Sequence, residues 1–153
     1  MLNDAGAKGA RYLADALQVN EVLTSLNLGG NHIGPNGAHY LSQALLFNTT
    51  LTSLNVAMNK IEDRGAAAIS DVVENNRTIT TINLGSNQIT HGGNMALCAA
   101  LRKNNVMVAL NLIGNEVEEE GYLAFADILA HRANMDVRLD DDEKLKKMAK
   151  NYR

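Results

Sequence analysis

The sequence has only one cysteine, Cys98, among its 153 residues, and it has no tryptophan. A single thiol has no partner for an internal disulfide, which excludes a small secreted fold held together by several cross-links. The lone cysteine fits a reducing compartment, and we therefore expect a cytoplasmic protein.

Aromatic residues and net charge are also scarce. Phe, Tyr and Trp together make up 4% of the chain, and the formal net charge is -3 at pH 7. So few rings leave little for base-stacking platforms, and a small negative charge gives no cationic field that would attract a polyanion. We expect no nucleic-acid partner.

Long apolar runs are missing as well. No stretch approaches the roughly 20 apolar residues of a membrane-spanning helix, and the first residues lack the pattern of a signal peptide. We expect no membrane partner. Hydrophobic residues nevertheless make up 46% of the chain, which is enough to bury the core of one domain.

The most informative feature that is present is a repeat. Residues 23–33, LTSLNLGGNHI, return 28 positions later as LTSLNVAMNKI, and the pattern continues as ITTINLGSNQI and MVALNLIGNEV. Self-similarity at a fixed period indicates a stack of similar structural units. The alignment predicts four full units, preceded by a partial unit and followed by a cap: 23–50, 51–78, 79–106 and 107–134, with 3–22 before them and 135–153 after them.

Each unit divides into a short strand and a helix. In the first unit, residues 25–29 alternate between polar and apolar side chains, which is the period of a half-buried strand. Residues 37–47 then carry apolar side chains at helical spacing, and Asn48 continues that stripe. One such unit cannot bury its own apolar stripe, so neighbouring units must stack.

The pattern LxxLxLxxNxI followed by a helix resembles leucine-rich repeats, and the 28-residue period is similar to the ribonuclease-inhibitor-like subtype. The resemblance covers residues 3 to about 139. It implies an α/β fold, a right-handed solenoid that forms a horseshoe segment, with parallel strands on the concave face and helices on the convex face. Residues 1–153 would then form a single repeat domain.

One asparagine of each unit is expected to have a structural role. A chain that turns inside a core leaves backbone N–H and C=O groups without partners, and an asparagine side chain supplies both an acceptor and donors. In the family these side chains form an asparagine ladder. The positions that match it here are Asn31, Asn59, Asn87 and Asn115, and the apolar residues expected to point inward in the first unit are Leu23, Leu26, Leu28 and Ile33.

The side chains between the inward residues of each strand must face outward, onto the concave face. Concave faces often bind partners in this family, but small polar residues also suit any exposed and crowded sheet, and both interpretations stay open. Few of the Trp, Tyr and Arg residues that dominate binding energies are present. The candidate partner-binding residues are Ser25, Asn27, Thr52, Ser53, Asn55, Met58, Thr81, Asn83, Ser86, Asn111, Ile113 and Arg138.

The two ends of the chain are expected to differ. Residues 135–139 should form a last strand, and a helix capped by Asp142 should cover the open end with Leu145 and Met148. At the N-terminus the strand that should precede residue 3 is missing, which leaves the edge of the first strand unpaired. Either the chain is cut from a longer array, or that edge pairs, for example in a weak homodimer.

No arrangement of residues indicates catalysis. The four histidines occupy unrelated repeat positions, and Cys98 falls where other units place Ser42, Ser70 and Ala126. The acidic run at residues 116–120 is either a solvated edge or a docking site for a basic partner. We expect no enzyme, no cofactor and no metal site.

The sequence therefore predicts a protein–protein interaction module or scaffold with an unidentified protein partner. The resemblance leaves two alternatives open. Similar repeats regulate a small GTPase in Ran GTPase-activating proteins, for which Arg64 would be the contributor here. Similar repeats also occur in larger intracellular sensors, in actin-capping proteins of the tropomodulin type and in bacterial effectors, from which this chain could be a segment.

Overall fold

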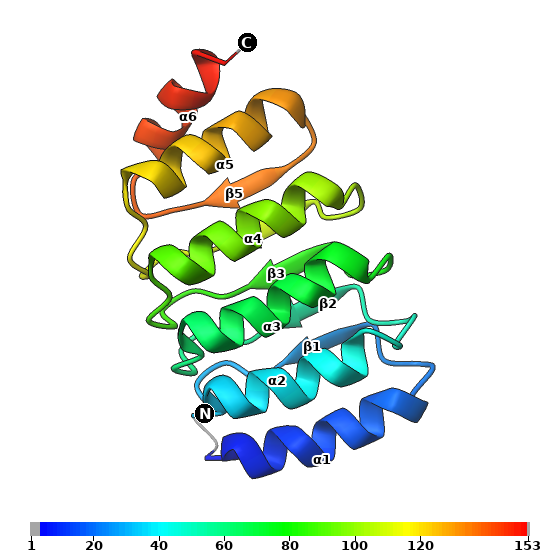
Figure 1. Ribbon diagram of the computed structural model, residues 1–153. Coiled ribbons are helices and arrows are strands. Elements are labelled where there is room, and N and C mark those ends of the chain that lie inside the picture. The colour runs from blue at the N-terminus through cyan, green and yellow to red at the C-terminus, as the bar shows by residue number, and fades with distance from the viewer. Residues whose placement is uncertain (1–3, 153) are drawn as a thin grey trace.

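The computed structural model describes residues 4–152, in which five strands alternate with six helices (Figure 1). The first strand ends two residues earlier than the sequence predicts, and the helix after it begins three residues earlier. Residue 3, where the partial unit was expected to begin, lies outside the described residues. The elements are α1 (Gly6–Val19), β1 (Ser25–Asn27), α2 (Gly34–Leu45), β2 (Ser53–Asn55), α3 (Glu62–Asn75), β3 (Thr81–Asn83), α4 (His91–Lys103), β4 (Ala109–Asn111), α5 (Glu119–His131), β5 (Asp136–Arg138) and α6 (Asp142–Lys150).

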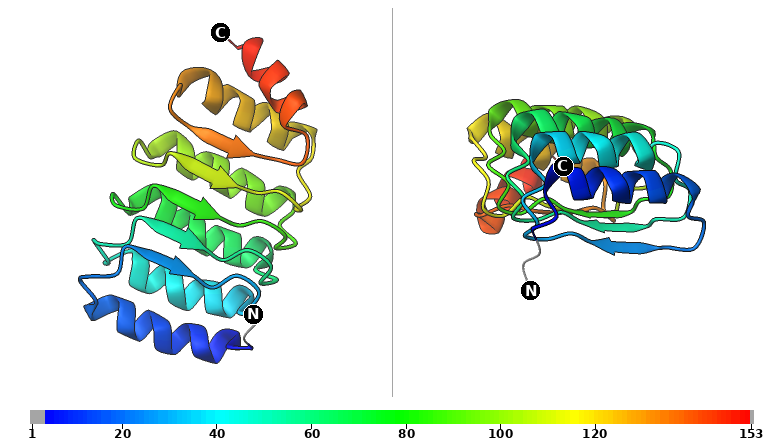
Figure 2. Two further views of the ribbon diagram at one scale, coloured as in Figure 1. Left: turned by 180° about the vertical axis from the view of Figure 1, so that it is seen from behind. Right: turned by 90° about the horizontal axis from the view of Figure 1, so that it is seen from below.

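The strands form one parallel sheet in the order β1-β2-β3-β4-β5, and helices α1 to α5 lie on one face of the sheet (Figure 2). Leu26 lies beside Leu54, which lies beside Ile82, so strands one period apart are in register. The step from Leu110 to Val137 is one residue shorter, as the sequence indicates. The predicted α/β solenoid with parallel strands is confirmed.

The core lies between the sheet and the helices, where equivalent apolar residues of successive units contact one another. Leu54 and Ile82 are buried in the inner strands, whereas Leu26 is only partly buried. Leu23, which is expected to point inward, is 37% exposed, whereas the equivalent Leu51 and Ile79 are buried. No described strand precedes β1, so nothing covers Leu23 from that side.

A small residue sets how closely each helix packs on the one before it. A Cβ atom at Gly65 would lie 2.4 Å from Ile61 Cγ2 and 3.1 Å from Ala38 Cβ. Gly37 has the same relation to Ala10 in the preceding helix. The glycine that recurs in every unit therefore permits close helix packing, which a side chain would disrupt.

The asparagines in the turns after the strands join each unit to its neighbours. Asn87 Oδ1 accepts hydrogen bonds from the backbone N–H groups of Asn59 (2.8 Å) and Ile61 (3.3 Å) in the preceding unit. Its Nδ2 donates to Val56 O in that unit and to Leu84 O in its own (both 2.9 Å). One buried side chain thus satisfies four backbone groups of two neighbouring coils. Asn59 and Asn115 make equivalent bonds to the preceding unit, and the Asn31 side chain donates to Leu28 O and Gly29 O of its own unit.

A second ladder, which sequence reasoning missed, lies at the opposite end of the strands. Asn76 Nδ2 donates to Leu45 O (2.7 Å) and Asn48 O (3.0 Å) of the preceding unit, and its Oδ1 accepts from Ile79 N (2.8 Å). Asn48 was expected to continue the stripe of α2, but α2 ends at Leu45 and Asn48 bonds in the same way as Asn76. Both residues are 5% exposed, so the asparagines that begin the two glycosylation sequons, Asn48-Thr49-Thr50 and Asn76-Arg77-Thr78, are buried.

The cap at the C-terminus differs from the prediction in two residues. Asp141 rather than Asp142 is the N-cap of α6, since its side chain accepts from Lys144 N at 2.9 Å. Asp142 instead accepts from Leu139 N at 3.1 Å. Leu145 is buried in the core as expected, whereas Met148 is only partly buried and Ala149 takes the second buried place.

The turn ladder yields a stability prediction. We expect Asn87→Ala to lower the free energy of unfolding by about 1–3 kcal/mol, because it leaves buried backbone groups without partners. Asn75→Ala is the matched control, since Asn75 lies exposed at the end of α3 and bonds only to Asp71 O within its own helix. Urea denaturation measures both variants, and equal stabilities for the two would contradict the role given to Asn87.

Candidate functional site

The predicted partner-binding residues lie on strands β1 to β5 or within three residues of a strand end. All twelve are exposed or partly exposed, and the parallel register brings those of neighbouring strands together. We refer to these twelve residues as the concave strip. The pairing places like beside like, for example Ser25 beside Ser53 and Asn55 beside Asn83.

The asparagines of the concave strip also stabilise the backbone, which sequence reasoning missed. Asn55 Oδ1 accepts from Ala57 N at 3.0 Å, and Asn83 Oδ1 accepts from Gly85 N at the same distance. Asn27 and Asn111 make the same bond. An asparagine that accepts from the backbone two residues on is a common turn motif, so its position at the end of each strand could have indicated this role. The amide Nδ2 remains available to a partner.

The rest of the strip is neutral over the first four strands and has two exposed apolar side chains. Met58 is 60% exposed and Ile113 is 43% exposed. Met58 has φ 59° and Ser86 has φ 53°, at the position where other units have Gly30 and Gly114. The left-handed backbone there turns the chain away from the sheet at one place in each unit.

The charged end of the concave strip lies on β5. Arg138 Nε donates to Asp136 Oδ2 at 2.9 Å, and both side chains are more than half exposed. An ion pair of this kind contributes little to stability in water. It does place the only charged residue among the predicted site residues at one end of the strip, beside Ile113.

The acidic loop at residues 116–120 is partly neutralised within the protein. His91 lies 3.6 Å from Glu118 and 3.7 Å from Glu120, and Lys144 Nζ donates to Glu119. The Lys144–Glu119 pair favours a solvated edge over a docking site, because it neutralises some of the charge that would attract a basic partner.

The carboxylate of Asp63, which lies close to His91, has a structural role. Asp63 accepts from Thr90 N at 2.7 Å and from Thr90 Oγ1 at 2.6 Å, across the boundary between two units. Burial by itself would raise the pKa of Asp63, but the hydrogen bonds from Thr90 outweigh burial and leave that pKa below its usual value. Asp63 is therefore ionised at neutral pH and fixes the start of α4.

Groups that could carry chemistry are buried or scattered. Cys98 is fully buried at a helix position that holds Ser70 in another unit. Within residues 4–152, no three His, Cys, Asp or Glu side chains converge on a point where a metal ion could be held. In the same range no helix combines the length and the apolar character needed to cross a membrane.

The buried thiol yields a reactivity prediction. Burial raises the pKa of Cys98 to about 12, although the charge of Arg102 opposes the shift. We expect no reaction with a disulfide reagent at pH 8 in the folded state and a full equivalent of reaction in urea. The unfolded thiol ionises near pH 8.5, so the stability contribution of Cys98 is present below that pH and is lost as the pH rises toward 12. Rapid reaction of the folded protein would contradict this description of the site.

Comparison with known proteins agrees with the repeat and the fold. The family model for the leucine-rich repeat matches residues 19–42, 47–70 and 75–98, and no curated protein sequence matches the chain significantly. The actin-binding site 2 of leiomodin-1 is similar in structure, with 22% identity and a TM-score of 0.80 over 91% of this chain and 84% of that one. The tropomodulin C-terminal domain of Caenorhabditis elegans is 12% identical, with a TM-score of 0.79 over 94% of this chain and 90% of that one. At these identities the likeness concerns the fold alone.

Proposed function

Because the chain is a leucine-rich-repeat protein, we propose that it is a non-catalytic interaction module that binds a protein partner on the concave strip. The observation that carries the proposal is the register of the five strands. It places twelve outward side chains in one continuous surface, on a backbone that buried side chains fix at both ends of the strands.

A fixed backbone favours binding because less conformational entropy is lost when the partner arrives. The two exposed apolar side chains, Met58 and Ile113, are the strongest candidates for anchors, since apolar area removed from water supplies most of the affinity. The polar groups between them would provide hydrogen bonds through Nδ2 atoms and hydroxyls. Such a surface favours moderate affinity that is spread over many contacts, and it does not favour binding through a single deep contact.

Actin is the first partner to test. The leiomodin-1 structure is that of an actin-binding site, and it shares the fold over 91% of this chain. That likeness supports actin as a candidate, and it also supports the alternative in which this chain is a segment of an actin-capping protein. The ribonuclease-inhibitor-like subtype is part of the same proposal, since the 28-residue spacing of the strands is compatible with it.

The test compares actin binding by the wild type and by a variant with Ser53→Arg and Met58→Asp. Ser53 is preferable to Asn55, because Asn55 Oδ1 holds a backbone N–H group and its loss would also affect folding. Affinity for actin is measured by co-sedimentation with filaments and by titration of labelled monomers. We expect the variant to bind at least about tenfold more weakly, a loss of roughly 1.4 kcal/mol.

The matched control carries Asn75→Arg and Phe47→Asp, which make the same kinds of change at exposed positions at the ends of α3 and α2. Control binding equal to that of the wild type would support the concave strip. If neither variant differs from the wild type, the strip is not the binding surface. If the wild type does not bind actin, the wild type and the two variants are each used to capture other partners by affinity. Capture of the same proteins by all three would refute the concave strip as the binding surface.

A further inference from the structure

The first three strands share one pattern of side chains, a hydroxyl, an apolar residue and an asparagine. Their sequences are SLN in β1, SLN in β2 and TIN in β3. Side chains two residues apart in a strand lie on the same face, so each hydroxyl and its asparagine lie together on the concave strip. The register then sets equivalent residues of neighbouring strands side by side. We call these side chains the donor rows, with Ser25, Ser53 and Thr81 in one row and Asn27, Asn55 and Asn83 in the other.

The asparagines of the donor rows face a partner with N–H groups. Each Oδ1 already accepts a backbone hydrogen bond from two residues on, as Asn55 Oδ1 does from Ala57 N. These bonds fix which end of each amide is turned outward. Within residues 4–152, no group lies at hydrogen-bond distance from the three Nδ2 atoms or from the three hydroxyls of the rows. The rows therefore hold unused donors in fixed positions.

Small residues keep the surface beside these amides low. A Cβ atom at Gly29 would lie 3.3 Å from Asn27 Oδ1 and 3.7 Å from Asn55 Nδ2. A Cβ atom at Gly85 would lie 3.2 Å from the Oδ1 atom of the third asparagine in the row. A larger side chain at either glycine would stand beside the amides, and its absence lets a ligand approach them closely.

The donor rows contain no charged side chain, and this limits the class of ligand. A phosphate group on a protein carries a charge of about −1.5 to −2 at pH 7, and arginine or lysine normally holds it. A carboxylate has a single charge, and a few uncharged N–H or O–H donors stabilise it well. The donor rows therefore match carboxylates and do not match phosphate groups or a nucleic-acid backbone.

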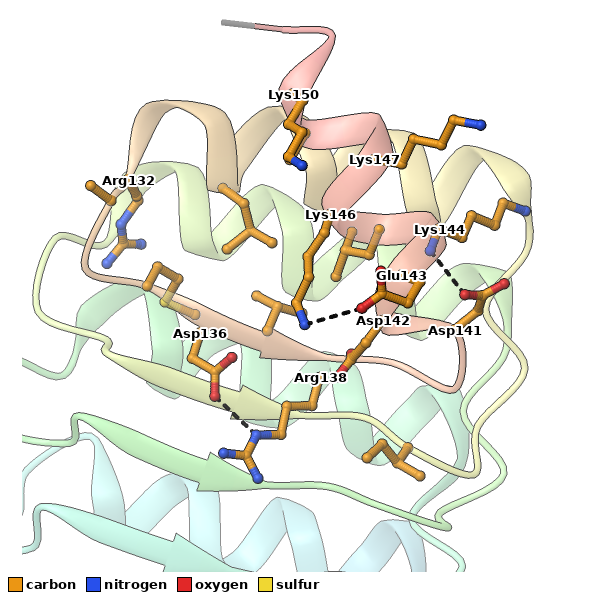
Figure 3. Close-up of a pocket in the computed structure, with 17 residues that line it drawn as sticks. Arg132, Asp136, Arg138, Asp141, Asp142, Glu143, Lys144, Lys146, Lys147 and Lys150 are labelled. Atoms are coloured by element: carbon orange, nitrogen blue, oxygen red, sulfur yellow. Dashed lines mark hydrogen bonds and ion pairs between the residues drawn. The ribbon is translucent and has the colours of Figure 1, made fainter.

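The pattern changes toward the C-terminal strand. Ala109 replaces the hydroxyl in β4, although Asn111 keeps the amide. In β5 Asp136 takes the place of the hydroxyl and Arg138 that of the asparagine, and these two side chains form an ion pair (Figure 3). A carboxylate at β5 would meet the charge of Asp136, so the surface that suits an acidic ligand is centred on β1 to β3.

The spacing of the donor rows fits a helix better than an extended chain. Neighbouring strands lie about 4.8 Å apart, whereas side chains on one face of an extended chain recur about every 6.6 Å. On a helix, residues three or four apart have Cβ atoms about 5–6 Å apart. Successive glutamates on one face of a helix that crosses the strands can therefore reach successive asparagines of the row.

We propose that the donor rows bind an acidic helix of a partner protein, which crosses β1, β2 and β3. Three carboxylates on one face of that helix accept hydrogen bonds from the Nδ2 groups of Asn27, Asn55 and Asn83, and the neighbouring hydroxyls supply further donors. The inference rests on the proposed function, because it uses the same concave strip, and it adds the chemistry of the partner.

The net charge of the chain does not prevent this contact. The formal charge of −3 is small, and salt screens its field beyond about 10 Å. Hydrogen bonds to the carboxylates act only at contact. Affinity should therefore persist when the salt concentration is raised, whereas an acidic ligand held by a cationic patch would be released.

The test uses a labelled, stapled helical peptide of alanine with glutamates along one face, and fluorescence anisotropy measures its affinity for the full chain. A second peptide has glutamine in place of each glutamate, which keeps the shape and removes the charge. Hydrogen bonds to a charged acceptor are roughly twice as strong as those to a neutral one. We expect the glutamate peptide to bind at least about tenfold more tightly than the glutamine peptide.

The protein variant for this test carries Asn27→Asp and Asn55→Asp. Aspartate keeps an oxygen that accepts from Gly29 N and Ala57 N, so both turns remain, but a carboxylate oxygen replaces each Nδ2 donor. We expect this variant to bind the glutamate peptide at least about tenfold more weakly than the wild type.

The matched control carries Asn36→Asp and Asn105→Asp, which change the net charge equally at exposed positions outside the sheet. Its affinity for the glutamate peptide should equal that of the wild type. NMR spectroscopy of the wild type detects the contact without any substitution. The side-chain N–H signals of the three asparagines in the donor rows should shift when the peptide is added, while those of the buried Asn48 and Asn76 should not.

Four results would overturn the proposal. They are equal affinity for the glutamate and glutamine peptides, equal affinity of the two aspartate variants, unchanged side-chain signals of the donor rows, and tighter binding of a peptide with phosphoserine in place of glutamate. Actin binding separates this proposal from the proposed function. If the Ser53→Arg and Met58→Asp variant loses actin while the variant with aspartates in the donor rows keeps it, the concave strip stands and the acidic helix fails.

Discussion

A buried asparagine side chain that bonds to two successive coils is the contact on which the rest of the structure depends. A strand-and-helix coil of 28 residues cannot bury its own apolar stripe, and its turns leave backbone groups inside the core. Asn59 and Asn87 satisfy those groups across the unit boundary, while Asn48 and Asn76 do so at the other end of the strands. Both ends of each strand are therefore fixed relative to the neighbouring strands, and the register follows.

The same frame explains where binding surfaces arise. Because the strands are fixed at both ends, their outward side chains form a surface that needs little ordering when a partner binds. A connection of only three residues, 139–141, places α6 over the end of the core, where Val137 and Leu139 are buried.

Much of the fold could be predicted from the sequence, because a strict period places equivalent residues of successive strands side by side. The alternation around Leu54 and the asparagine at position 59 recur in every unit, and periodic features of this kind predict strands, helices and the turn ladder. The second ladder was not predicted, since Asn48 also fits the helical spacing of α2 and the two patterns cannot be separated without knowing where the helix ends. The packing of α6 could not be predicted either, because it depends on contacts with α5 and not on any repeated residue.

Hydrogen exchange at the turn amides tests the central claim most directly. The N–H groups of Asn59 and Ile61 donate to the side chain of Asn87, whereas the N–H group of Val56 donates to the backbone of Asn83 (3.0 Å). If the ladder holds the coils together, all three amides exchange only when the whole protein unfolds, and their protection corresponds to the same free energy. Rapid exchange at Asn59 and Ile61, while Val56 stays protected, would show that the coils remain stacked without the ladder and would contradict the account.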